Sequence, residues 1–494
     1  MKGIRGTFLL LILFASIRLE AQGPDDALLM DQYHLISELE INSWVEKMCS
    51  PEYKGRLTGT SEYMNAAGWL AGKLNEWGVK PGGDNGTYFQ CFDRPWVEVK
   101  DRGEIKLLIP QKNEKTVFKE YLFPDDAVVG MATGSGQITA DVVFAGYGIT
   151  APELGYDDYS NVDVRNKIVL INRDVPYKDI SSPEYKKWVK YCYHIEKLQN
   201  AVKHGARGLL YMDGNSANPN IAYDPSIIVF GISQTVTNDI FALCNRDVKE
   251  IFNAIDRDFK PGSFNTGIRM SLKANSVYHP EGRGCSVIGI IPGSDPALKE
   301  ESIVVGGHFD GVGFIGNDIF PGAWDNASGV ADMMGALKAI ALSGIKPKRS
   351  IVFIFTGGEE VGLLGSKEYI NHPLLPLDKI LCYINLDMPG NGTGIGFSNG
   401  LTYPDIISYF EQANKQYTQR LFAATEKRPF YGRPRSDAGP FEEAGVKNMS
   451  LFITGAYKEG FYHLPGDTPE TITTEVMEDV AKILYIGLIR LADK

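Results

Sequence analysis

Five residues with metal-ligand chemistry follow apolar runs in the second half of the chain. His308 and Asp310 come directly after "SIVVGG", and Glu359 and Glu360 follow "SIVFIFTGG". Asp387 comes after the next apolar run, "KILCYIN". Imidazole nitrogen and carboxylate oxygen without thiolate are ligands that suit Zn²⁺, Co²⁺ or Mn²⁺. These residue types indicate a metal site, and two metals about 3.5–4 Å apart would form a hydrolytic one.

Asp325 and His463 join this set although they lie in turn-like segments. Asp325 stands in "AWDNASG", just before a helix expected over residues 327–342, and His463 stands in "FYHLPGDT". The chain has seven histidines, and the other five have no carboxylate cluster at a strand end beside them. Each residue alone would be interpreted as a helix cap or a hydrogen-bonded polar group. Their joint placement is what favours a metal site.

The neighbouring glutamates Glu359 and Glu360 pose an electrostatic problem, because like charges repel and a buried pair costs several kcal/mol without a cation nearby. Adjacent residues leaving a strand point in opposite directions. We therefore expect the two carboxylates to serve different atoms of one site, with a bound metal removing the repulsion.

The elements that must position these residues alternate between strand and helix. From about residue 283, strand-like runs such as "SIVVGGHF" and "SIVFIFTGG" are separated by helical segments. This alternation predicts a mostly parallel sheet with helices on both faces. Ligands of open α/β sheets bind at the carboxyl ends of the strands, which is where the polar residues lie.

Residues 140–275 have a different texture and predict a smaller α/β domain inserted into the first. Short β-like runs such as "ADVVFAGYGI" and "KIVLINRD" surround one strong helix expected over residues 183–205. Further helices are expected over 36–48 and 61–78, the second with Ser61 as its N-cap.

The charge balance argues against nucleic acid as the main partner, since 50 Lys and Arg stand against 61 Asp and Glu, a net charge of −11. Lys2 and Arg5 precede a short apolar run, "FLLLILFASI", and Ala21 stands at a cleavage point. This is a secretory signal pattern over residues 1–21, and an uncleaved membrane anchor is the alternative. We expect a secreted or periplasmic protein without stable membrane insertion after cleavage. The six cysteines contain no CxxC, and both disulfides and buried free thiols stay open.

Six motifs in a fixed order resemble the zinc-dependent aminopeptidase family of the M28 type. They are "GGHFDGVG", "WDNASGV", "FTGGEEVGLLGS", "NLDMPG", "RSDAGPFEEAGV" and "FYHLPGDT". Residues 142–171 are similar to the opening of the protease-associated (PA) domain that one subgroup carries as an insert. The resemblance implies a three-layer α/β/α sandwich of the zinc-exopeptidase type with a mixed, mostly parallel sheet. The catalytic domain would comprise residues 24–107 and 276–494, and a PA-like domain would occupy 108–275.

The resemblance also implies roles, residue by residue. His308, Asp325, Glu360, Asp387 and His463 would hold two Zn²⁺ per chain, with Co²⁺ or Mn²⁺ as substitutes and Asp325 as the bridge. Asp310 would orient His308, and Glu359 would be the general base for a metal-bridged hydroxide that attacks the peptide bond. Tyr462 would stabilise the oxyanion. Arg435 would lie near the substrate, although an exposed arginine in a basic loop with Arg433 is the alternative.

The implied activity is removal of the N-terminal residue from peptide substrates. The alternatives are a glutaminyl cyclase or a carboxypeptidase-like relative on the same scaffold, or an inactive binding homologue. Cyclases of this superfamily use a single zinc, so a complete set of five ligands disfavours them. Loss of a ligand or of the base would mark an inactive homologue, and none is missing. The oligomeric state and the preferred N-terminal residue stay open.

Overall fold

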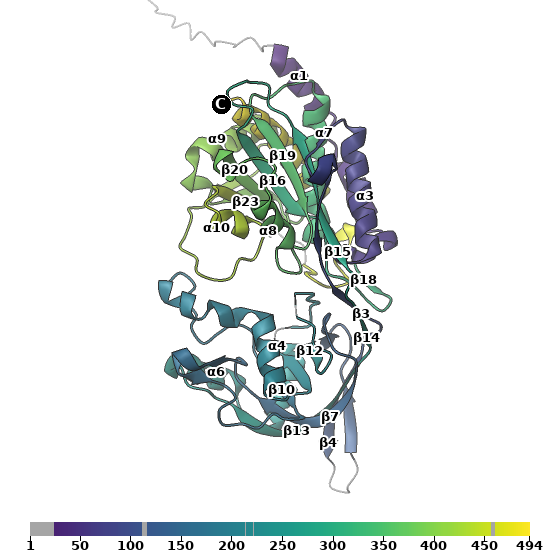
Figure 1. The fold of residues 1–494 in the computed structure, drawn as a ribbon, viewed down its shortest axis with the longest axis vertical. Coiled ribbons are helices and arrows are strands. Elements are labelled where there is room, and N and C mark those ends of the chain that lie inside the picture. Colours follow the sequence, from purple (N-terminus) through teal and green to yellow (C-terminus); the bar gives the residue numbers. More distant parts are fainter. Residues whose placement is uncertain (1–23, 111–115, 213, 221, 456–459) are drawn as a thin grey trace, which may run out of the picture.

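The computed structural model describes residues 24–110, 116–212, 214–220, 222–455 and 460–494. Two units are stacked along the long axis of the molecule, and each is built around one large sheet (Figure 1). The predicted signal peptide, residues 1–21, lies outside the described residues. No helix in the described part of the chain is long and apolar enough to cross a membrane.

The upper unit in Figure 1 contains a mixed sheet of nine strands. Its four central strands run parallel to one another, as the strand-helix alternation predicts, and the strands beyond them on either side pair antiparallel with this core. In spatial order the strands are β1 (Lys80–Pro81), β15 (Arg283–Ile291), β19 (Ser350–Thr356), β16 (Ser302–His308), β20 (Ile380–Leu386), β23 (Asn448–Thr454), β21 (Gly394–Ser398) and β22 (Phe422–Ala424), with β2 (Phe89–Asp93) also paired to β15.

Helices cover both faces of this sheet, which confirms the expected three layers. Alternate residues of β16 enter different cores: Ile303 and Val305 pack on one face and Val304 on the other. The first face carries α2 (Glu38–Met48), α3 (Ser61–Glu76), α7 (Ser328–Leu342), α9 (Pro404–Ala413) and α11 (Thr474–Ala492). The second face carries α8 (Leu364–Asn371) and α10 (Ala438–Glu443). Strands buried on both faces read as continuous apolar runs, as "SIVFIF" does.

The lower unit is a smaller α/β structure around an eight-stranded sheet (Figure 1). Helix α4 (His194–Lys203) packs on one face, and α5 (Gln234–Leu243) with α6 (Val248–Asp258) packs on the other. The strand order is β5 (Thr116–Glu120), β4 (Glu104–Pro110), β13 (Phe264–Ala274), β7 (Gly136–Phe144), β10 (Ile168–Ile171), β11 (Gly208–Tyr211), β12 (Ile228–Ile232) and β6 (Ala127–Val129).

An antiparallel pair of short strands, β3 (Trp96–Val99) and β14 (Ser276–His279), lies where the chain passes between the two units (Figure 1). A disulfide between Cys91 and Cys285 joins β2 to β15 beside this connection. The expected domain limits at residues 108 and 275 stay predictions.

The helix expected over residues 183–205 is wrong in its first half. Two short 3₁₀ turns, Pro183–Lys187 and Val189–Cys192, precede α4, which begins only at His194. Tyr185, Trp188 and Tyr191 are all buried. Their spacing of three residues matches the three residues per turn of a 3₁₀ helix, so these aromatic anchors favour the tighter winding.

The expected N-cap of the helix over residues 61–78 is also wrong by one position. Helix α3 begins at Ser61, and the cap is Thr60, whose hydroxyl accepts a hydrogen bond from the Tyr63 amide.

Candidate metal centre

Seven predicted site residues come together at one edge of the nine-stranded sheet. His308 is the last residue of β16, Asp387 directly follows β20, and the two glutamates follow β19 after a pair of glycines. Asp325 lies in the turn Ala323–Ala327 that leads into α7. The structure therefore brings the polar ends of three parallel strands to one place, as the strand-end pattern predicts.

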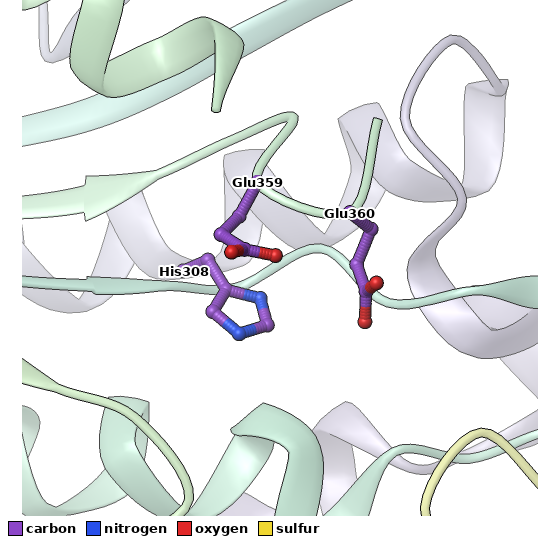
Figure 2. A group of neighbouring side chains, drawn as sticks. All are labelled: His308, Glu359 and Glu360. Atoms are coloured by element: carbon purple, nitrogen blue, oxygen red, sulfur yellow. The ribbon is translucent and has the colours of Figure 1, made fainter. Parts of the chain in front are cut away.

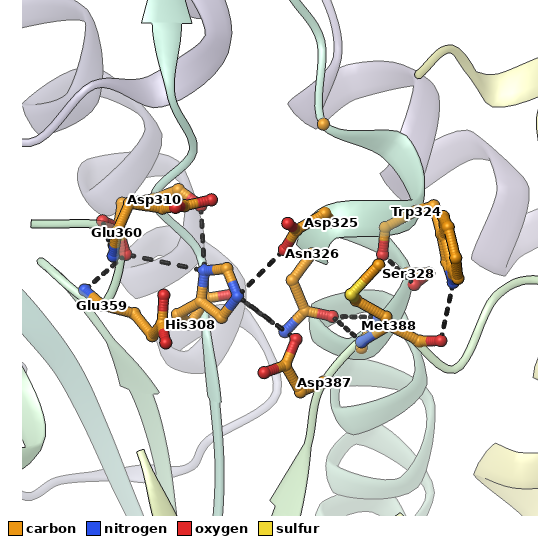
Figure 3. A network of polar contacts seen from close by, with 12 residues as sticks. His308, Asp310, Trp324, Asp325, Asn326, Ser328, Glu359, Glu360, Asp387 and Met388 are labelled. Carbon is orange, nitrogen blue, oxygen red and sulfur yellow. Dashed lines mark hydrogen bonds and ion pairs between the residues drawn. The ribbon is translucent and has the colours of Figure 1, made fainter. Parts of the chain in front are cut away.

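Two groups of ligand atoms share the carboxylate of Asp325. In the first, His308 Nε2 lies 3.2 Å from Asp325 Oδ1 and 3.5 Å from Asp387 Oδ1 (Figure 3). In the second, His463 Nε2 lies 3.2 Å from Asp325 Oδ2 and 3.1 Å from Glu360 Oε1. Each oxygen of Asp325 thus faces a different histidine, and the five residues divide into two sets of three.

These distances fit a metal between the atoms better than direct contacts. Two ligand atoms about 2.0–2.1 Å from one tetrahedral zinc lie roughly 3.3 Å from each other. Glu360 Oε1 and His463 Nε2 are buried, and neither makes a hydrogen bond within the part of the chain that the structure describes. Buried polar atoms in proteins are nearly always partnered. A cation in the second set would satisfy both atoms, and the ligand spacing in the first set fits a zinc ion as well.

The electrostatics of the two histidines also match a cation site. Burial alone would lower the pKa of His308, but hydrogen bonds to Asp325 and Asp387 outweigh it and raise the pKa well above its usual value. Burial likewise opposes the positive form of His463, and Glu360 with Asp325 raises its pKa. The carboxylates of the centre therefore favour positive charge at both ends of Asp325.

The two glutamates do not point in opposite directions, as was expected for residues leaving a strand. Strand β19 ends at Thr356, and Glu359 and Glu360 lie in a turn after Gly358, whose φ of +70° is available to glycine. Figure 2 shows both side chains projecting to the same side of this turn, with Glu359 beside the His308 ring. The alternation of a strand therefore does not separate them. Burial and the nearby Glu360 raise the pKa of Glu359 well above its usual value, against the opposing effect of His308.

Asp310 braces the centre in a way that the sequence did not suggest. His308 Nδ1 lies 3.2 Å from the backbone oxygen of Asp310 and 3.7 Å from its carboxylate (Figure 3). The carboxylate instead accepts hydrogen bonds from the backbone amides of Glu359 and Glu360, at 3.2 and 3.3 Å, and from Thr58. Asp310 thus fixes the glutamate turn relative to the histidine strand.

Sequence reasoning missed Asn326, a fully buried residue that ties three segments together (Figure 3). Its amide nitrogen donates to the backbone oxygens of His308 and Leu386, at 3.2 and 2.9 Å. Its oxygen accepts from the backbone amides of Gly329 and Met388. The signal was present in "WDNASG", where Asn326 directly follows Asp325.

Two other missed residues hold the loops around the centre. The carboxylate of Asp467 accepts hydrogen bonds from the amides of Trp324 and Asp325, at 2.8 and 3.1 Å. Arg56 is fully buried, and its guanidinium donates to four backbone oxygens, those of Met48, Phe309, Pro321 and Gly322. No pattern in the local sequence around Arg56 predicts these long-range contacts.

The remaining two predicted residues lie at the margin of the site. The ring of Tyr462 stacks on that of His463 with centroids 3.8 Å apart, and about half of the Tyr462 side chain is exposed. Arg435 is exposed and lines none of the cavities described below. Arg433, which was expected only as part of the same basic loop, lines a cavity of about 120 Å³ together with Tyr462 and His463.

His463 is also held by the lower unit. Its Nδ1 lies 2.7 Å from the backbone oxygen of Ala217, and the Ala217 amide donates to the backbone oxygen of His463 at 3.0 Å. Ala217 lies between β11 and β12 of the eight-stranded sheet. A segment far away in sequence therefore fixes one of the candidate ligands.

Comparison with known proteins gives two family matches. Residues 286–486 match the model of peptidase family M28, and residues 138–240 match that of the PA domain. Leupeptin-inactivating enzyme 1 of Streptomyces exfoliatus is 33% identical over 35% of this chain and 37% of its own length. Aminopeptidase YwaD of Bacillus subtilis is 24% identical over 68% of this chain and 66% of its own. The chain thus spans about one to two thirds of these curated relatives.

Solved structures share the fold over nearly the whole chain. An aminopeptidase from Aneurinibacillus sp. strain AM-1 superposes with a TM-score of 0.62 at 19% identity, covering 93% of this chain and 95% of its own. A peptidase M28 precursor from Shewanella amazonensis gives a TM-score of 0.62 at 20% identity, over 95% and 98% of the two chains. These structures show the shared fold, and the family matches show that residues 286–486 belong to peptidase family M28 with a PA domain ahead of them.

Proposed function

We propose that this protein is a secreted or periplasmic zinc aminopeptidase with two metal ions per chain. The observation that carries the proposal is Asp325, whose two carboxylate oxygens each lie 3.2 Å from a different histidine. His308 and Asp387 would complete one metal site, and Glu360 and His463 would complete the other. A second full set of ligands favours this function over a cyclase with a single zinc.

Zinc bound at these residues would acidify a water molecule and polarise the peptide carbonyl. Glu359 is the residue of this chain that would accept the proton and later return it to the leaving amine. Glu359 groups with His308 and Glu360 but lies in neither set around Asp325, and this position beside both proposed metal sites supports that role (Figure 2). The hydroxyl of Tyr462 would donate to the developing oxyanion, because its ring lies directly on His463.

The choice of aminopeptidase over other peptidases rests on the relatives. The B. subtilis relative is named an aminopeptidase, and so is the solved structure from Aneurinibacillus. Peptides with a free N-terminus would be the substrates. Arg435 stays a proposed substrate contact, although its exposure gives that role no support.

Hydrolysis of leucine p-nitroanilide tests this function. We expect activity on the free amine, none on the N-acetylated compound, and loss of activity with a chelator that added Zn²⁺ reverses. Cleavage confined to N-blocked peptides with a free C-terminus would contradict the proposal. Cyclisation of N-terminal glutamine without arylamide hydrolysis would point to the cyclase instead.

Export is supported by two features. The basic and apolar pattern of residues 1–21 is that of a secretory signal, and the disulfide between Cys91 and Cys285 is the kind of bond that persists in oxidising compartments. Cell fractionation followed by N-terminal sequencing tests it. The mature chain is expected outside the cytoplasm and to begin close to residue 22, whereas a cytoplasmic chain that retains Met1 would overturn the export proposal.

A further inference from the structure

A cavity of about 210 Å³ lies between the two units, beside the candidate metal centre. Its wall combines Val361 of the upper unit, Met131 and Tyr223 of the lower unit, and Arg94, Trp96 and Tyr278 from the connection around β3 and β14. Figure 1 shows β3 and β14 at the junction of the two units. The cavity thus combines aromatic and apolar side chains with one cation, Arg94, and with the polar side chain of Thr58.

Arg94 has no partner for its charge. Its side chain makes no hydrogen bond or ion pair with any residue that the structure describes, and its Nε is buried without a partner. Burial lowers the pKa of the guanidinium, while Tyr278 and Asp310 act in the opposite direction. The contrast is Arg56, which donates to four backbone oxygens nearby. The residue is partly exposed, but its buried Nε lacks a partner, so an anionic group is the expected complement of Arg94.

The cavity adjoins the metal centre on both sides. Val361 directly follows the candidate ligand Glu360, and Thr58, another wall residue, donates to the Asp310 carboxylate at 3.0 Å. On the opposite wall, Ala217 contacts His463 and Tyr223 lies six residues further along the same segment. Both walls of the cavity are therefore linked to residues of the metal centre.

We propose that the Arg94 cavity binds a carboxylate of the peptide substrate, which makes short peptides with a free C-terminus the preferred substrates. This inference rests on the proposed aminopeptidase function. An aminopeptidase cleaves after the first residue, so the rest of a di- or tripeptide extends away from the metals, and in the adjoining cavity its C-terminus would meet Arg94. Guanidinium and carboxylate form paired hydrogen bonds, and the aromatic walls exclude water that would weaken them.

The carboxylate can come from the C-terminus or from an acidic side chain, and a substrate panel distinguishes the two. The test compares kcat/KM for Leu-Gly-Phe, its C-terminal amide, Leu-Asp-Phe amide and glutamate p-nitroanilide, with leucine p-nitroanilide as reference. We expect the free acid to exceed its amide by about tenfold or more, because the amide cannot form the charge-assisted pair with Arg94. Preference for either acidic-side-chain substrate instead would assign the same cavity to that side chain.

The variant Arg94→Gln should bring the ratio of free acid to amide close to one. Arg94→Lys keeps the charge without the planar fork and should give an intermediate ratio, which protects the test if the glutamine variant folds poorly. Arg165→Gln is the matched control, because Arg165 is exposed and pairs only with Asp163 on the surface of the lower unit. The control should retain the full preference.

Two failures are distinguishable. If the zinc-loaded protein hydrolyses leucine p-nitroanilide but treats all acids and amides alike, the Arg94 proposal is wrong and the function stands. If it hydrolyses nothing, the aminopeptidase proposal is wrong, and calorimetric binding of Leu-Gly-Phe and its amide to the wild-type and Arg94→Gln proteins still tests the cavity. Equal binding of acid and amide by the wild type would then overturn it.

Discussion

His463 and Ala217 hold each other across the two units of this protein. The His463 imidazole Nδ1 lies 2.7 Å from the Ala217 oxygen, and the Ala217 amide donates to the His463 oxygen at 3.0 Å. The backbone of His463 is left-handed, with a φ of 56°, which is uncommon for a residue other than glycine. The lower unit, which contains the segment matched to the PA domain, therefore helps to hold a candidate zinc ligand in place.

Ala217→Pro should weaken zinc binding at one of the two sites, because proline lacks the amide that donates to His463. This backbone hydrogen bond holds the Ala217 carbonyl against the His463 ring, and disturbing such an outer contact to a ligating histidine typically costs about 10–100-fold in metal affinity. The measurement is zinc release to a competing chelator. Ala217→Gly keeps both backbone groups and should behave like the wild type. Unchanged release from the proline variant would mean that the lower unit does not support the centre.

Glu359→Gln and Glu360→Gln should have different effects although the residues are neighbours. The first should retain both zinc ions and lose turnover by about 10²–10⁴-fold, because a general base contributes that much. The second removes a charged ligand next to His463 and should lose zinc. Metal content and kcat on the same preparations decide the matter. Loss of zinc from the Glu359 variant alone would mean that Glu359 is the metal ligand and Glu360 the general base.

Arg56→Met should destabilise the protein even though Arg56 touches none of the candidate ligands directly. Four backbone oxygens would lose their donor, and each unsatisfied buried group costs about 1–3 kcal/mol. We expect the free energy of unfolding to fall by roughly 3 kcal/mol or more in denaturant titrations. Arg165→Met, at an exposed position, is the control. Equal stability of the two variants would show that water replaces the lost contacts.

Asp332→Leu should stabilise the protein, and more so at higher pH. Asp332 lies in α7, is fully buried, and neither carboxylate oxygen has a partner among the described residues. Burial raises its pKa well above that of the unfolded chain. The folded state therefore retains a proton that the unfolded state loses above about pH 4, so this group lowers stability as pH rises.

Leucine removes both the unpartnered buried carboxyl group and this pH dependence. The free energy of unfolding of the variant should exceed that of the wild type by about 1–3 kcal/mol at pH 7.5 and by less at pH 5.5. Denaturant titrations of both proteins at the two pH values measure the difference. A loss of stability on substitution, or a gain that is the same at both pH values, would contradict the assignment of Asp332 as an unpaired buried acid.

The sequence predicted which candidate ligands lie together better than it predicted the residues that support them. His308, Glu360 and Asp387 follow apolar runs that are central parallel strands, and such strands present their ends together. The 3₁₀ turns before α4 were missed because apolar residues spaced three apart also suit an α-helix. Contacts such as those of Arg56 and Ala217 depend on which distant backbone groups lie nearby. The local sequence around a residue does not predict such contacts.

The number of metals bound per chain is the most direct test of the proposed dinuclear centre. Apoprotein titrated with Zn²⁺ should bind two equivalents by calorimetry and elemental analysis, with leucine p-nitroanilide hydrolysis rising until the second site is filled. Asp325→Asn should weaken both sites together, because each oxygen of Asp325 faces a different histidine. Saturation at one equivalent, or full activity without added metal after complete chelation, would contradict the dinuclear centre.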